Sequence, residues 1–194
     1  MIGQTTIGII VFDGVLTSEV IGAAEVFALA SQRKGLEGLQ VKLIGVEPQE
    51  SIRTEENIRL LVDATIDDDL RLDVLIVPGA SDVDHLLTHE KLNKFIQKQE
   101  ESAQWVGSVC AGAFVLSGAG VLDGKQATTW YGGENRLQTQ FPQVHVVHDQ
   151  PVVIDDRRIT ANGGLVSYRA ALVLLLALAI AAVIALRSRA LAAR

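Results

Sequence analysis

The sequence contains one cysteine, Cys110, at the junction of an apolar run and a run of small residues in "WVGSVCAGAFVL". This arrangement predicts a strand that turns sharply into a helix, as at a nucleophile elbow. A thiol held there lies at a helix N-terminus, whose partial positive charge favours the nucleophilic thiolate. Free cysteines are often simply buried, so a packing role is the alternative. Gly112 favours the elbow, because a packing cysteine does not need a glycine two residues later.

A nucleophile of this kind also needs N–H groups that stabilise a developing negative charge. The amide of Ala111 follows the cysteine directly. In an open α/β sheet the carboxyl ends of the strands form the ligand crevice, so the turn "VPGA" supplies a second donor from Gly79 or Ala80. These three residues are therefore the predicted oxyanion or substrate-binding positions. Trp130 and Tyr131 follow a strand-like segment and either line the crevice or belong to the core.

The four histidines of the chain give no coherent metal site. His85 and His89 have the spacing of two ligands on one helix face, but no third ligand accompanies them, and exposed histidines are far commoner than metal sites. His145 and His148 lie in or beside a predicted strand and would face opposite sides of it. We predict no metal and no cofactor.

The elements that would position these residues alternate between strand-length apolar runs and segments with helical periodicity. That alternation is typical of an α/β fold with a parallel sheet. Strands are predicted at 5–12, 40–46, 73–80, 105–110 and 144–148, with extended structure at 57–69 and a hairpin in "VVIDDRRIT" that turns at Asp155 and Asp156. Helices are predicted after the first strand, at 88–102, and from Phe114 to the glycines at 118 and 120. Because no linker or repeat interrupts the pattern, we expect a single domain over residues 1–194.

Composition narrows the class of protein. Hydrophobic residues make up 48% of the chain and charged residues 21%, so a sizeable core can form. A net charge of −6 argues against a nucleic-acid partner, because such proteins usually present a basic face. One cysteine excludes an internal disulfide and fits a reducing compartment. The first residues lack the basic and cleavage regions of a signal peptide, so the expected location is the cytoplasm.

Taken together, these segments resemble the ThiJ/PfpI family of the class I glutamine-amidotransferase-like superfamily. "SVCAGAFVLSGAGVLDGKQATTWYGG" resembles the family's cysteine elbow, and "IIVFDGVLTSEVIGAAEVF" looks like its first strand and helix. "LIVPGA" is similar to its glycine turn, and "ITANGGLVSYRAALVLL" to its closing strand and helix. The resemblance runs from about Thr6 to Leu176. It implies a three-layer, flavodoxin-like sandwich with a mostly parallel central sheet.

The resemblance also implies roles for two residues. Cys110 matches the family's reactive cysteine, and Glu19 matches the carboxylic acid that hydrogen-bonds its sulfur and holds the thiolate. A carboxyl group beside an apolar crevice can stay protonated and donate to sulfur, which agrees with that role. Without the resemblance, the preferred interpretation of Glu19 is an acid at the start of a helix that interacts with the helix dipole.

Two departures from the family pattern bear on activity. Ala111 stands where many proteases and amidotransferases of the superfamily carry histidine, so a Cys–His peptidase is not expected. Members similar to isocyanide hydratase carry threonine there and aspartate in place of Glu19, which leaves that branch and glyoxalase-like chemistry both open. We expect a cysteine-dependent hydratase or hydrolase that acts on a small electrophilic molecule. The alternative is a non-catalytic, redox-sensing stress-response protein, in which Glu19 stabilises a Cys110 sulfinate.

The C-terminal segment is unusually apolar. From Ala170 to Leu186 there is no polar or charged residue, a length of about 26 Å as a helix, and a basic tail follows. That length is at the lower edge of what a bilayer needs, and arginines flank both ends. A helix that is apolar on all sides is expected to be covered on all sides. Burial in the fold together with a homodimer contact is the favoured interpretation, and membrane contact through 170–186 is the minority one.

Overall fold

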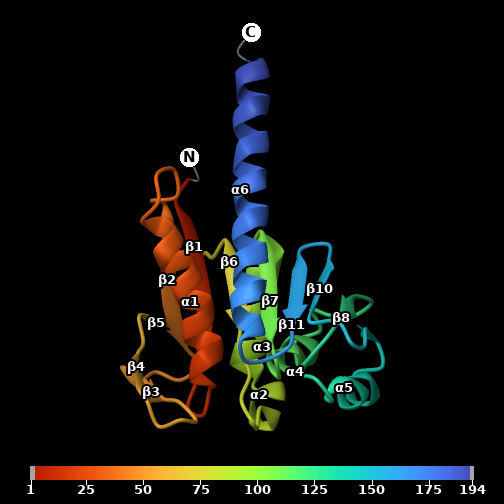
Figure 1. The fold of residues 1–194 in the computed structure, drawn as a ribbon. Helices are drawn as coiled ribbons and strands as arrows, with labels where there is room; N and C mark the ends of the chain where they lie inside the picture. Colours follow the sequence, from red (N-terminus) through yellow and green to blue (C-terminus); the bar gives the residue numbers. More distant parts are fainter. Residues whose placement is uncertain (1–2, 193–194) are drawn as a thin grey trace.

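A seven-stranded sheet forms the centre of the structure, a computed structural model that describes residues 3–192 (Figure 1). The strand order is β10-β11-β7-β6-β1-β2-β5, and β10 is the strand that runs antiparallel to its neighbour. The strands are β1 (Thr5–Val11), β2 (Leu39–Gly45), β5 (Ala64–Thr65), β6 (Val74–Val77), β7 (Trp105–Val109), β10 (Val152–Asp155) and β11 (Arg158–Ala161). The predicted α/β fold with a mostly parallel sheet is confirmed.

Helices cover both faces of this sheet. On one face lie α1 (Thr17–Ser31) and α6 (Val166–Ala192), which pack side by side. The opposite face is covered by α2 (Asp84–Leu87), α3 (Glu90–Ser102) and α4 (Gly112–Gly118). The result is the three-layer arrangement that the resemblance implied. Because both faces of the sheet are covered, β1 and β6 are apolar nearly throughout rather than alternating.

The remaining elements lie outside the central sheet. A hairpin of β3 (Ser51–Arg53) and β4 (Arg59–Leu61) forms at the carboxyl edge, and β8 (Gln126–Ala127), β9 (His145–Val146) and α5 (Glu134–Gln140) lie beside β10. The strand predicted at 144–148 is therefore the short β9, which pairs with β8. The region around His85 and His89 is also divided, since α2 ends before α3 begins. The His89 side chain instead caps α3 by accepting from the Leu92 N–H at 3.1 Å.

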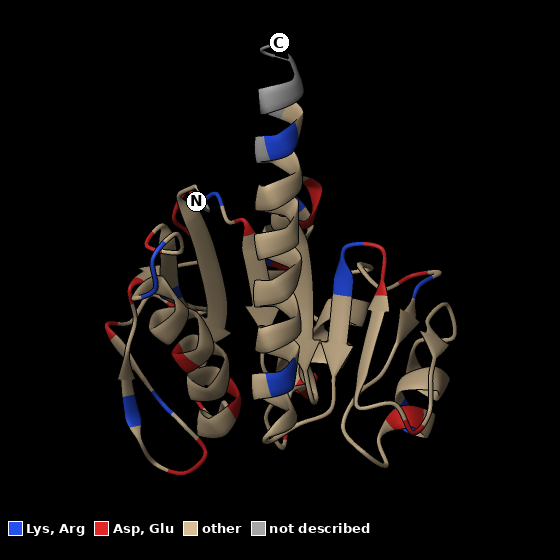
Figure 2. Cartoon of the chain, turned by 45° about the horizontal axis from the view of Figure 1, so that its top comes forward, with Lys and Arg blue, Asp and Glu red and all other residues tan. Residues whose placement is uncertain are grey.

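Helix α6 packs on the sheet over only the first half of its length. Its buried residues, Ala170, Ala171, Leu174 and Leu178, form one face. From residue 179 to residue 185 no side chain is buried within the described chain. Figure 1 shows this part projecting past the amino ends of the strands, and Figure 2 shows that it carries no charge until near its end. The expectation that the fold buries this helix on all sides is therefore met only on one face of its first half.

By length and composition, Val166–Ala185 qualifies as a helix that could cross a membrane. The core helices of soluble proteins can satisfy the same criteria. Residues 170–178 pack on the sheet, so the first half of α6 is the closing helix of the domain that was expected. The last two residues of the basic tail, 193–194, lie outside the described residues.

Candidate active site

Cys110 stands on a strained turn directly after β7. Its φ is 54°, in the left-handed region that side-chain-bearing residues rarely adopt. Two hydrogen bonds fix this backbone: the Cys110 N–H donates to the Ala161 carbonyl at 2.8 Å, and the Thr129 hydroxyl donates to the Cys110 carbonyl at 2.8 Å. A Cβ atom on Gly112 would overlap the carbonyl oxygen of Val77, so only glycine fits as α4 begins. The local geometry is that of the predicted nucleophile elbow.

The carboxyl group of Glu19 is fully buried in the first turn of α1. Its Oε2 accepts a hydrogen bond from the Gly79 N–H at 2.7 Å, and its Oε1 accepts one from the Gly164 N–H at 3.2 Å. The Leu16 N–H donates to the Gly79 carbonyl at 3.0 Å and ties the start of α1 to the same turn. Two separate turns therefore hold the Glu19 carboxyl in place. An acid that only interacts with the helix dipole would not need these two hydrogen bonds.

Glu19 and Cys110 meet beside Gly163. A Cβ atom at Gly163 would lie 2.7 Å from Glu19 Oε1 and 3.0 Å from Cys110 Sγ, so both reactive atoms border one small space. The fold thus brings together the two residues that the sequence placed in one site. Gly163 and Gly164 were not predicted as site residues, and the double glycine after a strand was the signal for them.

The two acidic groups influence each other's protonation. Burial raises the pKa of Glu19, against the opposing effect of the Gly79 and Gly164 N–H groups. Burial, followed by the charge of an ionised Glu19, raises the pKa of the Cys110 thiol to about 12, while the Ala111 N–H lowers it. A sulfur that faces an ionised carboxylate therefore keeps its proton. The Cys110 side chain in turn lowers the pKa of Glu19, so a Cys110 thiolate forms only when Glu19 holds a proton.

The turn after β6 presents three consecutive amides to the site. The N–H of Gly79, one of the predicted oxyanion donors, is engaged by Glu19. The N–H of Ser81 donates to Glu55 Oε2 at 3.1 Å, and the Ser81 hydroxyl donates to Glu55 Oε1 at 2.6 Å. Between them, the N–H of Ala80 has no protein acceptor within residues 3–192. Of the two residues predicted on this turn, Gly79 is therefore the one whose amide already has a protein acceptor.

Two acidic side chains lie close enough to the site for their charges to act on it. Glu55 and Glu56 lie in the turn of the β3–β4 hairpin, where Glu56 Oε2 accepts from the Thr17 N–H at 3.0 Å and the Glu55 N–H donates to the Val15 carbonyl at 3.1 Å. Their charges act on the buried pair, Glu55 on Cys110 and Glu56 on Glu19. Sequence reasoning missed both residues, because nothing local indicates that this hairpin folds over the turn after β1.

The remaining candidates lie apart from this chemistry. Trp130 stacks on Phe114, with ring centroids 4.9 Å apart, and so belongs to the packing behind the elbow. Tyr131 is 78% exposed and does not form a crevice wall. No group of three or more potential metal ligands occurs in the part of the chain that the structure describes.

Comparison with known proteins agrees with this geometry. The family model described as DJ-1/PfpI matches residues 5–175. The chain belongs to the DJ-1/PfpI family. The match includes the elbow, Glu19 and both turns that hold it, and it ends within α6, before the part of that helix that leaves the sheet.

Individual members of the DJ-1/PfpI family show what this chain is similar to. It is 30% identical over 159 residues to an isonitrile hydratase of Pseudomonas putida, covering 82% of this chain but only 65% of the hydratase. It is 27% identical over 128 residues to a glutathione-independent glyoxalase, DJR-1.2, of Caenorhabditis elegans, covering 65% of this chain and 66% of the glyoxalase. The crystal structure of Drosophila melanogaster DJ-1beta superposes with a TM-score of 0.75 at 24% identity, covering 88% of each chain. That last likeness shows the fold.

Proposed function

We propose that this protein is a cysteine-dependent enzyme that adds the elements of water to a small electrophilic molecule. One observation carries the proposal: Cys110 sits on a strained elbow and borders the same small space as the buried Glu19 carboxyl. Strained backbone at a solvent-accessible cysteine, held by specific hydrogen bonds, is typical of a reacting group rather than a packing one.

In the first step the Cys110 thiolate attacks the electrophilic carbon and forms a C–S bond. With an isocyanide, the proton held by Glu19 passes to that carbon and gives a thioimidate. With an α-oxoaldehyde, the same proton passes to the carbonyl oxygen and gives a hemithioacetal. The N–H groups of Ala80 and Ala111 stabilise the charge that develops before the proton arrives.

Water completes the reaction in either case. Its attack on the thioimidate breaks the C–S bond and releases a formamide. The Glu19 carboxylate, having given up its proton, removes the C–H proton of the hemithioacetal and returns it to the adjacent carbon, while the hydroxyl proton moves to the neighbouring oxygen. The product is a thioester, which water hydrolyses to a hydroxy acid. In both sequences the sulfur leaves as a thiolate and one proton returns to Glu19, so the pair is regenerated with its single charge.

Two further observations support this class of substrate. The named activities of the hydratase and glyoxalase relatives both act on small electrophilic carbon centres. The charges of Glu55 and Glu56, which act on the Cys110–Glu19 pair, make the site unfavourable for anions and favour uncharged substrates.

The test is a panel of isocyanides and α-oxoaldehydes, assayed with the wild-type protein and with Cys110→Ser and Cys110→Ala. We expect turnover of at least one class by the wild type and a loss of about a thousandfold or more in both variants. Turnover that persists in Cys110→Ser would rule out the proposal. A wild-type protein that turns over neither class, yet gains two oxygens on Cys110 under mild peroxide, would favour the redox-sensing alternative.

A further inference from the structure

The second half of α6 forms a projection that we call the C-terminal arm, residues 179–192. It leaves the domain at the amino ends of the strands, opposite the edge that holds Cys110 (Figure 1). Large apolar side chains on the arm are exposed, including Ile180, Val183 and Ile184. Exposed apolar surface of this extent indicates an interaction site.

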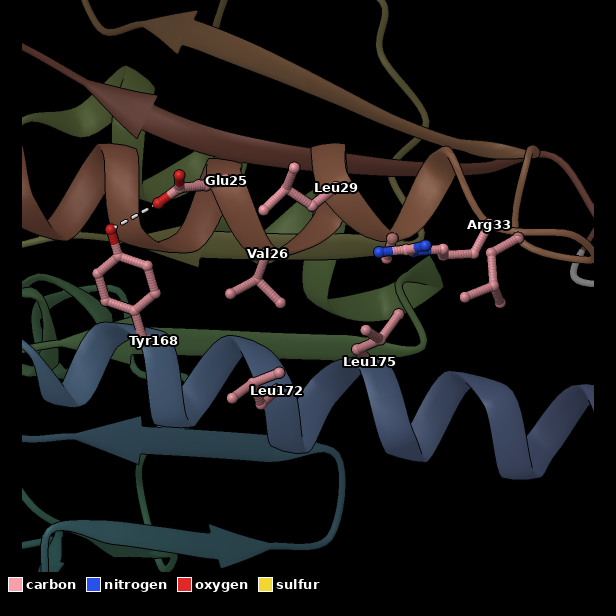
Figure 3. A pocket seen from close by; sticks show the side chains of 9 residues that line it. Glu25, Val26, Leu29, Arg33, Tyr168, Leu172 and Leu175 are labelled. Carbon is pink, nitrogen blue, oxygen red and sulfur yellow. Dashed lines mark hydrogen bonds between the residues drawn. The ribbon is translucent and has the colours of Figure 1, made fainter.

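A groove runs along the domain between α1 and α6, directly below the arm. Its volume is about 500 Å³, and apolar side chains from both helices form most of its walls (Figure 3). The lining residues are Glu25, Val26, Leu29, Ala30, Arg33, Leu36, Tyr168, Leu172 and Leu175. The rim is also apolar and exposed, since Leu29 and Leu172 are each more than half accessible.

We propose that the arm of a second copy of this chain fills this groove, and that the two copies exchange arms about a twofold axis near Leu178. In this arrangement the two α6 helices run antiparallel, and each arm lies along the docked half of the other helix. The docked half, residues 166–178, is about 20 Å long, and residues 179–192 form enough helix to cover it.

The pattern along α6 is self-complementary in this register. Four exposed side chains repeat every fourth residue and form one stripe that continues from the docked half onto the arm: Leu172, Leu176, Ile180 and Ile184. Antiparallel pairing about Leu178 places Leu172 opposite Ile184 and Leu176 opposite Ile180. A twofold interface requires this reciprocity, because each contact must occur twice.

Charged residues of both signs meet at the far end of the groove in this register. Glu25 is exposed there and accepts a hydrogen bond from the Tyr168 hydroxyl at 2.7 Å (Figure 3). The first charged residue on the arm is Arg187, which is also exposed. Antiparallel pairing about Leu178 places Arg187 of one copy opposite the exposed Arg169 of the other, so Glu25 is the acid at this end of the groove that can offset the two arginines.

A bilayer is a poorer partner for the arm in this geometry. Only eight residues, 179–186, separate the last buried position from Arg187, about 12 Å of helix against the roughly 30 Å of a hydrocarbon core. To span a membrane, residues 166–178 would have to leave the sheet and expose the core beneath them. A second copy covers the arm with the domain intact.

A disulfide between copies tests the register directly. Leu172→Cys and Ile184→Cys are introduced together in a Cys110→Ser background. Within one chain these positions are about 18 Å apart along the helix, too far for a disulfide. We expect a covalent dimer on oxidation, and only monomer when either substitution is present alone. A dimer that forms equally well with Ile184→Cys alone would indicate parallel arms and overturn the proposal.

Solution mass of the full chain tests the interface without cross-linking. By light scattering, we expect the wild type to be a dimer and Ile180→Glu to be a monomer. Ile154→Glu is the matched control, because Ile154 on β10 is exposed to nearly the same extent, and it should remain dimeric. Two outcomes would overturn the proposal: a dimer that survives Ile180→Glu, or a monomer that floats with phosphatidylcholine–phosphatidylglycerol vesicles and loses this property in Ile180→Glu.

Discussion

The Gly79 N–H donates a hydrogen bond of 2.7 Å to the Glu19 carboxyl, linking the turn after β6 to the first turn of α1. This bond uses an amide that an oxyanion would otherwise take and leaves the next one, that of Ala80, free of protein acceptors within residues 3–192. One turn thus fixes the acid and also carries the Ala80 donor that we propose for the substrate. The position of the acid and the stabilisation of charge are coupled through adjacent residues.

A side chain at Gly163 would lie between Glu19 and Cys110. A methyl group in Gly163→Ala would lie 2.7 Å from Glu19 Oε1 and 3.0 Å from Cys110 Sγ, so it separates the pair. We expect a fall in turnover of about tenfold to a hundredfold with little change in far-UV circular dichroism. Gly3→Ala is the control, since a Cβ there meets nothing within 4 Å. Unchanged turnover in Gly163→Ala would show that close contact between carboxyl and thiol is unnecessary.

The charge of Glu55 should slow the reaction of Cys110 with anionic reagents. Glu55→Gln keeps an acceptor for Ser81 but removes a charge that acts on Cys110. We expect alkylation of Cys110 by anionic iodoacetate to accelerate several-fold, while the neutral reagent iodoacetamide changes much less. The exposed Glu101 on α3 supplies a control, and Glu101→Gln should alter neither rate. Equal acceleration with both reagents would mean that Glu55 acts only through the pKa of the thiol and has no effect on the approach of anions.

Glu19 should make stability depend on pH in a defined direction. Burial raises the pKa of this carboxyl above its ordinary value of 4.5, so its contribution to stability is complete below that value and is lost as pH rises through the folded-state pKa. Glu19→Gln cannot ionise. The melting temperature of the variant relative to the wild type should therefore increase between pH 4.5 and pH 8, as measured by thermal unfolding. A difference that stays constant over this range would show that the Glu19 pKa is not raised.

Much of the fold was predictable from sequence, because strands covered on both faces are continuously apolar. The segments at 5–12, 40–46, 73–80 and 105–110 correspond to β1, β2, β6 and β7. The segment at 144–148 was harder to interpret: Val144 is buried, but it packs outside the central sheet. For the C-terminal helix, the sequence showed that the segment is apolar. It could not show that the sheet covers only the first half of the helix.

The site was partly predictable for similar reasons. The local sequence around Cys110 and Gly112 predicts the elbow, and the resemblance to the family predicted the role of Glu19. Glu55 could not be found this way, since its role depends on a hairpin that folds back over another loop. The engagement of the Gly79 N–H by Glu19 was equally hidden, because a sequence shows which amides lie on a turn and not which acceptor each one meets.

The measurement that tests the central claim most directly is the rate of Cys110 alkylation by iodoacetamide between pH 6 and pH 8, in the wild type and in Glu19→Gln. If the pair shares one charge, the wild-type rate should be nearly flat, while the variant should rise about tenfold per pH unit and be at least tenfold slower at pH 6. If instead an ionised Glu19 keeps the thiol protonated towards pH 12, removing its charge should make Glu19→Gln faster than the wild type across the range. That result would contradict the account.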